Sequence, residues 1–224
     1  MTEDIFNKDS QENEHFSSRE FTPLRHDAFE KTPTEKQVEI EKHFFAIMET
    51  LGLDMNDDSL KDTPKRVSKM FVNEIFGGLL PENEPIPSTF QNHYKYNQML
   101  VEKDITVYST CEHHFLPIIG KAHVAYISNG KVIGLSKINR IVNYYSRRPQ
   151  VQERLTMQIV QSMKKAVGTE DVACVIDAKH LCLNSRGIRD TSSSTLTAEL
   201  SGAFKNNTNT RREFLQYIGM NLKL

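Results

Sequence analysis

QMLVEKDITVYSTC, residues 98–111, is the point at which the chain changes from helical to strand patterns. The residues before it place apolar side chains at helical spacing, whereas this segment is rich in β-branched residues. Further on, GKAHVAYISNGKVIGL at residues 120–135 predicts a β-hairpin, because its Asn129-Gly130 pair tolerates the positive φ angles of a two-residue turn. The sequence therefore predicts a sheet that starts near residue 99.

Two helices are predicted before this point. In residues 32–54 an apolar face recurs at helical spacing, and Thr34 with Gln37 matches a capping box. Residues 61–79 predict the second helix, with Thr63 as its N-cap.

Helices and strands also mix after residue 135, but they do not alternate as they do in a doubly wound sheet. This order favours an antiparallel α+β domain over residues 99–224, behind an N-terminal helical region at 33–98. The later segments are a helix at 136–148, a helix at 151–168, a strand at 171–183, a strand ending near Phe204 and a last helix near 210–218.

The length of 224 residues fits one medium-sized domain. No apolar run approaches the roughly 18 residues that a membrane helix needs, and the polar start is unlike a secretory signal, so no membrane partner is expected.

Three cysteines are too few for a disulfide framework, which predicts free thiols in a reducing cytoplasm. Residues 1–35 contain nine acidic and four basic residues, and residues 1–32 are expected to form a mobile acidic tail.

No acidic residue occurs from His113 to Gln152, and Glu153 ends this run. Such a run is typical either of a basic surface or of a site for a polyanion with one carboxylate at its edge. Nucleic acid is not expected as the partner, because few aromatic residues alternate with these charges and the net charge is only −1. The basic residues of the run are Lys121, Lys131, Lys137, Arg140, Arg147 and Arg148.

A metal site is predicted around CEHH, residues 111–114. Cys111 and His114 have the Cys-x2-His spacing with which a short turn aims two ligands at one zinc ion. Cys182 is the candidate third ligand, since it ends a predicted strand beside a polar loop, whereas Cys174 lies among apolar neighbours and is expected in the core. Three ligands with one open position are typical of catalytic zinc. The alternative is that the cysteines are unconnected buried residues.

An anion site is predicted at GLSKINR, residues 134–140. Ser136 is the expected N-cap of a helix, and Lys137 and Arg140 follow on one face of its first turn. Cations at a helix N-terminus oppose the dipole, so they favour an anion ligand there, although a solvated face is the alternative. Further cations that can join this site are Arg66, Arg186 and Arg189.

Gln152 and Glu153 stand in the first turn of the next predicted helix. A carboxylate at that position is favourable for the helix dipole alone. It can also accept two N–H donors side by side, as from the edge of guanine, and its place beside the basic run favours that interpretation.

Four motifs resemble GTP cyclohydrolase I in order and spacing: CEHHFLPIIGKAHVAYI, VIGLSKINRIV, RPQVQERLTMQI and HLCLNSRGIRD. TPKRVSKMF and TRREFL are similar as well, so the resemblance covers about residues 35–220. It implies an α+β tunnelling fold, an antiparallel sheet with helices packed on one face, assembled as a homodecamer with active sites between chains. It also implies zinc and the conversion of GTP and water to formate and 7,8-dihydroneopterin triphosphate, the first step of pterin or folate biosynthesis.

The resemblance also implies catalytic roles. His113 resembles the general acid–base beside the purine. His180, with Ser136 close by, resembles the residue that assists opening of the ribose. The residues that resemble the zinc ligands are Cys111, His114 and Cys182.

Substrate-binding roles follow in the same way. Gln152 and Glu153 resemble a guanine clamp. A zinc-stabilised nucleotide-binding or regulatory protein without turnover is the competing class, and a reductase of the same fold is disfavoured because nothing suggests a nicotinamide site. The residues that resemble triphosphate binders are Arg66, Lys137, Arg140 and Arg186.

Overall fold

The computed structural model describes residues 21–220, and these residues form the predicted α+β arrangement of helices and strands. The first 20 residues of the expected acidic tail lie outside the described part. Residues 21–32 are described, and they contact the first helix: Lys36 Nζ donates to the Ala28 carbonyl at 2.8 Å.

Helix α1 (Pro33–Thr50) begins two residues earlier than the capping pattern predicted. Its capping box is Thr32 with Glu35: the Glu35 N–H donates to Thr32 Oγ1 at 3.3 Å, and the Thr32 N–H donates to Glu35 Oε2 at 2.8 Å. The prediction of Thr34 and Gln37 is wrong because Pro33 takes the first helical position, where its missing N–H costs nothing.

Helix α2 (Thr63–Met70) packs against α1 and continues into irregular turns. Asp62, not Thr63, precedes its first turn, and no side chain caps it. The π-helical turn η1 (Phe71–Ile75) and the 3₁₀ turns η2 (Gly77–Leu79) and η3 (Pro81–Asn83) follow. Gly78 is required here, because a Cβ atom would lie 2.0 Å from the Tyr144 carbonyl oxygen.

The main sheet has five strands in the order β5-β2-β3-β6-β7. Strands β2 (Met99–Cys111), β3 (Pro117–Ile127), β6 (Val172–His180) and β7 (Thr195–Leu200) pair antiparallel, as predicted for the domain. Strand β5 (Pro149–Gln150) lies parallel to the last residues of β2. Its pairing brings the start of the following helix to the end of β2.

The predicted hairpin of residues 120–135 is wrong. Strand β4 (Lys131–Ile133) pairs with β1 (Thr89–Gln91) in a separate two-stranded sheet, although Gly130 has the expected positive φ of 88°. The reason is that β3 is bonded along both edges, to β2 on one side and to β6 on the other. No edge of β3 is left for β4.

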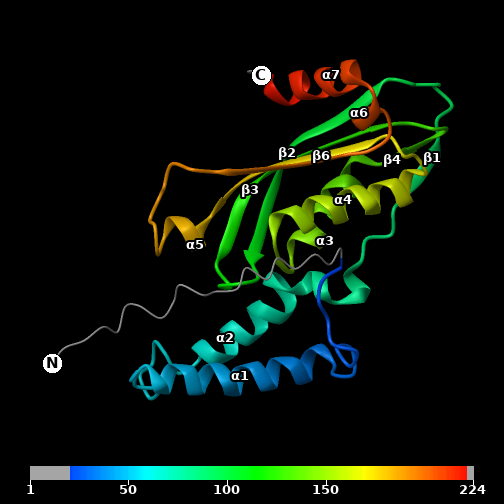
Figure 1. The fold of residues 1–224 in the computed structure, drawn as a ribbon. Helices are drawn as coiled ribbons and strands as arrows, with labels where there is room; N and C mark the ends of the chain where they lie inside the picture. The colour runs from blue at the N-terminus through cyan, green and yellow to red at the C-terminus, as the bar shows by residue number, and fades with distance from the viewer. Residues whose placement is uncertain (1–20, 221–224) are drawn as a thin grey trace.

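Helices cover both faces of the main sheet, so the expectation of helices on one face is wrong (Figure 1). Helices α3 (Leu135–Ser146) and α4 (Gln152–Val167) pack on one face, where side chains such as Val124 point. The C-terminal helices α6 (Ala203–Asn206) and α7 (Thr208–Gly219) cover the other face with Phe204 and Phe214. The alternation of side chains along each strand supplies both apolar faces.

Two local boundaries also differ from the prediction. Helix α3 begins at Leu135 with Gly134 at the N-cap, so Ser136 is its second residue and caps nothing. Strand β6 ends at His180, and Cys182 lies in the short helix α5 (Leu181–Asn184) that follows. The predicted helix at 151–168 is confirmed as α4, and Gly168 ends it in the left-handed conformation.

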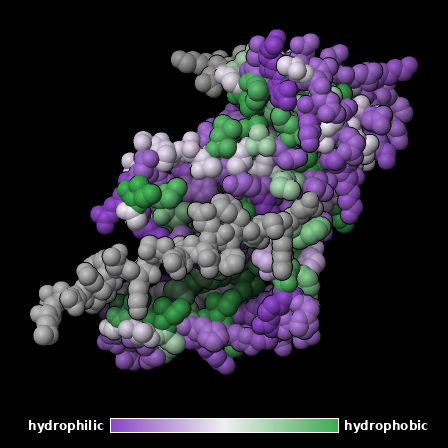
Figure 2. Space-filling model, in the orientation of Figure 1, coloured by the Kyte–Doolittle hydropathy of each residue, from purple (hydrophilic) through white to green (hydrophobic). Residues whose placement is uncertain are grey.

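The N-terminal helical layer carries apolar side chains on its surface (Figure 2). Between residues 21 and 220, no helix combines the length and apolar character needed to cross a bilayer. The exposed apolar residues of α1 and the turn after it are Val38, Phe45, Ile47, Leu51 and Leu53.

Candidate active site

A tight turn joins β2 to β3 and contains the CEHH motif. The Phe115 N–H donates to the Cys111 carbonyl at 2.9 Å, and the Cys111 N–H donates to the Leu116 carbonyl at 2.8 Å. Phe115 has a φ of 54°, which is uncommon for a residue with a side chain, and its ring packs edge-on against Phe76. The turn bends the chain, so neighbouring side chains of the motif no longer alternate as they do in an extended strand.

The turn brings Cys111 and His114 together with Cys182. Their sulfur and imidazole nitrogen atoms all lie within 4.8 Å of one another, although Cys182 comes from a different element, α5. We call these three residues the metal trio. Two thiols and one imidazole are a donor set that zinc prefers, and a trio leaves a fourth coordination position open.

Cys182 lies close enough to Cys111 for the two sulfurs to affect each other. Burial, and next the neighbouring Cys111 sulfur, raise the pKa of the Cys182 thiol above its ordinary value of 9.0. Without a cation the thiolate is therefore disfavoured, whereas metal binding requires and stabilises it. Cys174 is fully buried in the core, as predicted, where burial raises the pKa of its thiol.

His113 lies beside the trio but outside it. Its Nδ1 is 3.9 Å from Cys111 Sγ, and the corresponding His114 distance is 4.0 Å, so the distance to Cys111 does not separate the two histidines. The position of Cys182 does separate them. Of the two histidines, only His114 belongs to the group whose ligand atoms all lie within 4.8 Å of one another. The His113 side chain is 58% exposed, which leaves its imidazole open to a ligand.

Glu112, the remaining residue of the motif, points into the protein. Its carboxylate accepts two hydrogen bonds from Arg154 of α4, from Nη1 at 2.6 Å and from Nη2 at 3.3 Å. The Arg154 side chain is 2% exposed and that of Glu112 is 15% exposed. The backbone N–H of Glu112 also donates to the Gln150 carbonyl at 3.0 Å. These contacts fix Glu112, which stands between Cys111 and His113 in the sequence, and so hold the backbone of the motif in place.

Sequence reasoning missed Glu112 and Arg154 as site residues. The run without acidic residues ends at Gln152, two positions before Arg154, so its pattern does not include this arginine. A charged residue among the apolar residues of α4 was the available signal, because a fully buried arginine needs a partner.

Gln152 and His180 are in direct contact. His180 Nε2 lies 2.8 Å from Gln152 Oε1, and the Gln152 side chain is 1% exposed. Gln152 Nε2 donates to the carbonyls of Ile176 and Thr195 at 3.1 and 2.8 Å. Both polar atoms of the Gln152 side chain, which is predicted as half of a guanine clamp, therefore have partners inside the protein.

Glu153 and His180 lie close enough to interact electrostatically. Burial lowers the pKa of His180 from its ordinary value of 6.5, and the Glu153 carboxylate opposes this shift. Glu153 itself is exposed at the start of α4, so its oxygens can reach a ligand.

The structure does not bring Ser136 and Lys137 beside the metal trio within one chain. They lie in the first turn of α3, which begins two residues after Ile133, and the Ile133 N–H donates to Tyr126 Oη at 3.3 Å. Tyr126 lies near the end of β3 that is remote from Pro117, where the CEHH turn enters the strand. Helix α3 then runs about 18 Å back along the sheet toward the turn.

The other predicted cations lie in three places. Arg140 lines a cavity of about 190 Å³ together with Gly77, Asn143 and Arg147. Arg66 pairs with Asp62 at 3.6 Å on the surface of α2. The exposed residues Arg186 and Arg189 follow α5 and are therefore the predicted cations nearest to Cys182 in the chain.

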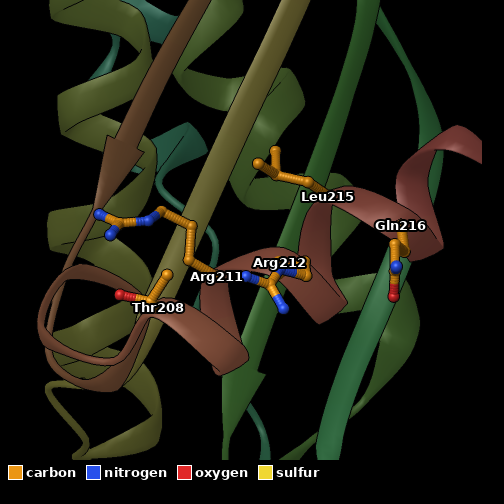
Figure 3. A pocket seen from close by; sticks show the side chains of 5 residues that line it. All are labelled: Thr208, Arg211, Arg212, Leu215 and Gln216. Atoms are coloured by element: carbon orange, nitrogen blue, oxygen red, sulfur yellow. The ribbon is translucent and has the colours of Figure 1, made fainter.

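A second depression, of about 410 Å³, lies over α7 and contains no predicted site residue (Figure 3). Thr208, Arg211, Arg212, Leu215 and Gln216 line it. It is shallow and open, unlike the enclosed sites in which ligands are usually held.

Comparisons with known proteins identify the family of this chain. The family model of GTP cyclohydrolase I matches residues 40–219. The chain is 68% identical to GTP cyclohydrolase 1 of Flavobacterium johnsoniae over 204 residues, which is 91% of each chain. It is 55% identical to that of Aeromonas salmonicida over 81% of this chain and 83% of the relative, and 50% identical to that of Yersinia enterocolitica over 89% and 90%. The chain therefore belongs to the GTP cyclohydrolase I family of enzymes.

Proposed function

We propose that this chain is a zinc-dependent enzyme that converts GTP and water into formate and 7,8-dihydroneopterin triphosphate. The observation that carries the proposal is the convergence of two thiols and one imidazole in the metal trio. Family membership supplies the reaction class. The reaction would be the first step of pterin and folate biosynthesis.

The metal trio fits zinc by the chemistry of its donors. Zinc held by Cys111, His114 and Cys182 would supply Lewis acidity and a bound water of lowered pKa, which is the kind of nucleophile that hydrolysis at C8 of the purine needs. Cys174 is excluded as a ligand because it is buried in the core on β6.

We assign the proton transfer at purine N7 to His113. Its exposed imidazole is adjacent to the trio, and imidazole is the side chain whose ordinary titration spans neutral pH. The buried Glu112–Arg154 pair holds the backbone of the motif, so His113 can be aimed without being a ligand.

We assign the later acid–base steps on the ribose to His180, with Ser136 close by in the assembled site. Guanine recognition falls to the exposed Glu153 carboxylate, which can accept two N–H donors in parallel. Binding energy from the triphosphate can hold the purine in place without taking part in bond making. The cations proposed for the triphosphate are Arg66, Lys137, Arg140 and Arg186.

We further propose that the active sites form between chains of a homo-oligomer, as a decamer. Ser136 and Lys137 lie in the first turn of α3, at the end of the sheet remote from the trio, and in this proposal a second chain supplies them. The exposed apolar side chains of α1 offer a surface for assembly. In this proposal residues 99–224 form the catalytic domain with a tunnelling fold, and residues 33–98 form the helical region that joins subunits.

A reducing compartment such as the cytoplasm suits this proposal. The three cysteines are free thiols, and two of them would serve as metal ligands. Oxidation would remove the thiolates that the trio needs.

The test is to incubate zinc-loaded protein with GTP and to follow formate release and the pterin chromophore together. We expect both products with the wild-type chain and neither with Cys182→Ala. The matched control is Cys174→Ala, which removes a core thiol and should keep both products. A zinc-bound wild-type protein that releases neither product would overturn the proposal in favour of nucleotide binding without turnover.

A further inference from the structure

The carboxamide of Gln152 has only one orientation that satisfies its neighbours. Its Nε2 faces the carbonyl oxygens of Ile176 and Thr195, at 3.1 and 2.8 Å. A carbonyl oxygen can only accept, so turning the amide over would place Oε1 against two acceptors in a buried site. The nitrogen therefore faces the sheet, and Oε1 faces His180.

Two threonine hydroxyls reinforce this orientation. Thr156 Oγ1 donates to the backbone carbonyl of Gln152 at 2.8 Å, and the two hydroxyls are 2.7 Å apart. Because the Thr156 proton is used on that carbonyl, Thr197 donates to Thr156, and Thr197 Oγ1 presents a lone pair to Gln152 Nε2 at 3.1 Å. This hydroxyl shares the two amide protons with the carbonyls of Ile176 and Thr195, so it also favours the nitrogen on this side.

This orientation of the amide determines the protonation of His180. Gln152 Oε1 carries no proton, and His180 Nε2 lies 2.8 Å from it, so Nε2 must carry the proton of that hydrogen bond. In the neutral ring, Nδ1 is then the nitrogen with a free lone pair.

We propose that Gln152 is a positioning residue that holds the His180 ring in place as the Nε2–H tautomer, so that the lone pair of the neutral ring lies on Nδ1. The role of His180 on the ribose rests on the proposed function, whereas the tautomer itself rests on the hydrogen bonds alone. It replaces the predicted role of the Gln152 side chain in binding guanine.

The direct test is solid-state NMR of the full-length protein with ¹⁵N-labelled histidine, at about pH 8, where an ordinary imidazole is neutral. The His180→Asn variant identifies the signals of His180 by their loss. We expect a single tautomer with the proton on Nε2. A neutral His180 protonated on Nδ1 would overturn the proposal, and this measurement needs neither GTP nor turnover.

Kinetics of Gln152→Met provide the second test, because methionine fills the same volume without the amide. We expect both tautomers of His180 to appear and pterin formation to fall by about 10- to 100-fold, with formate release and the KM for GTP little changed. The matched control is Thr197→Val, which leaves both carbonyl acceptors of the amide in place and should keep a single tautomer.

The outcomes separate the two proposals. If Gln152 binds guanine instead, Gln152→Met will raise the KM for GTP and lower formate and pterin equally, which contradicts the positioning role. If the wild-type chain releases no formate at all, the proposed function is wrong. The NMR measurement still tests the tautomer of His180 independently of that result.

Discussion

Arg154 of α4 and Glu112 of the CEHH turn form a two-point ion pair, with Nη1 to Oε2 at 2.6 Å and Nη2 to Oε1 at 3.3 Å. The pair is nearly inaccessible to solvent, with the arginine side chain 2% exposed. It ties the turn that carries the metal trio to the first helical turn of α4, which carries Gln152 and Glu153. This buried ion pair joins the two halves of the candidate site, alongside the pairing of β5 with β2.

We predict that Arg154→Met lowers the free energy of unfolding by about 3 kcal/mol, because it leaves the Glu112 carboxylate buried without its charge partner. The measurement is urea unfolding at fixed protein concentration, since assembly affects apparent stability. The double variant Glu112→Gln/Arg154→Met should recover part of the loss.

The control for this prediction is Arg212→Met, which changes an exposed arginine of α7 and should cost less than about 0.5 kcal/mol. Equal losses for Arg154→Met and Arg212→Met would show that the buried pair contributes nothing particular.

The ion pair also marks the limit of prediction from this sequence. Glu112 and Arg154 are 42 positions apart, and no local pattern joins them. Local features were predicted well: the Cys-x2-His turn, the end of α4 at Gly168 and the burial of Cys174 all depend on near neighbours.

Strand pairing could not be predicted from local pattern. The Asn129-Gly130 turn forms, yet β4 pairs with β1 because β2 and β6 already occupy both edges of β3. The competition for an edge is decided by strands far away in the chain. Likewise Cys182 reaches the trio from α5 and not from the strand face that predicted it.

We predict that the two adjacent histidines have separable roles. His114→Ala should lose most bound zinc, because it removes one of the three ligands that converge in the trio, whereas His113→Ala should keep zinc and lose turnover. Zinc content measured by mass spectrometry after dialysis, together with formate release, checks both statements. Retention of zinc by His114→Ala with its loss from His113→Ala would reverse the ligand assignment.

We predict that His123 makes the folded chain sensitive to acid. Its Nδ1 accepts the Asp104 N–H at 3.1 Å in a β-bulge where Asp104 has a φ of 59°, and protonation of Nδ1 removes that acceptor. Burial lowers the pKa of His123 below its ordinary value of 6.5, with Asp104 and Asp177 opposing the shift and Lys103 and Lys121 adding to it. At pH values between the pKa of His123 in the folded chain and its ordinary value, the unfolded chain therefore binds a proton that the folded chain does not.

Stability should accordingly be full above about pH 6.5 and should fall as the pH drops below that value. We expect the Tm of the wild-type chain to decrease more between pH 7.5 and pH 5.5, chosen to span about one unit on either side of an ordinary histidine pKa, than the Tm of His123→Asn. The asparagine Oδ1 can accept the same N–H and does not titrate. An equal decrease in both proteins would contradict the prediction.

The last prediction concerns active sites shared between chains. The metal trio and the start of α3 lie at opposite ends of the sheet in one chain, so each site should combine the trio of one chain with Lys137 of another. Cys182→Ala and Lys137→Ala chains are each expected to be inactive alone. Unfolded, mixed in equal amounts and refolded together, they should recover activity at about one quarter of the sites, since each intact half is drawn at random.

The control is a chain with both substitutions, mixed in the same way with Cys182→Ala, which should stay inactive because no chain then offers an intact trio. Absence of recovery in mixed oligomers of confirmed composition would mean that each chain completes its own site.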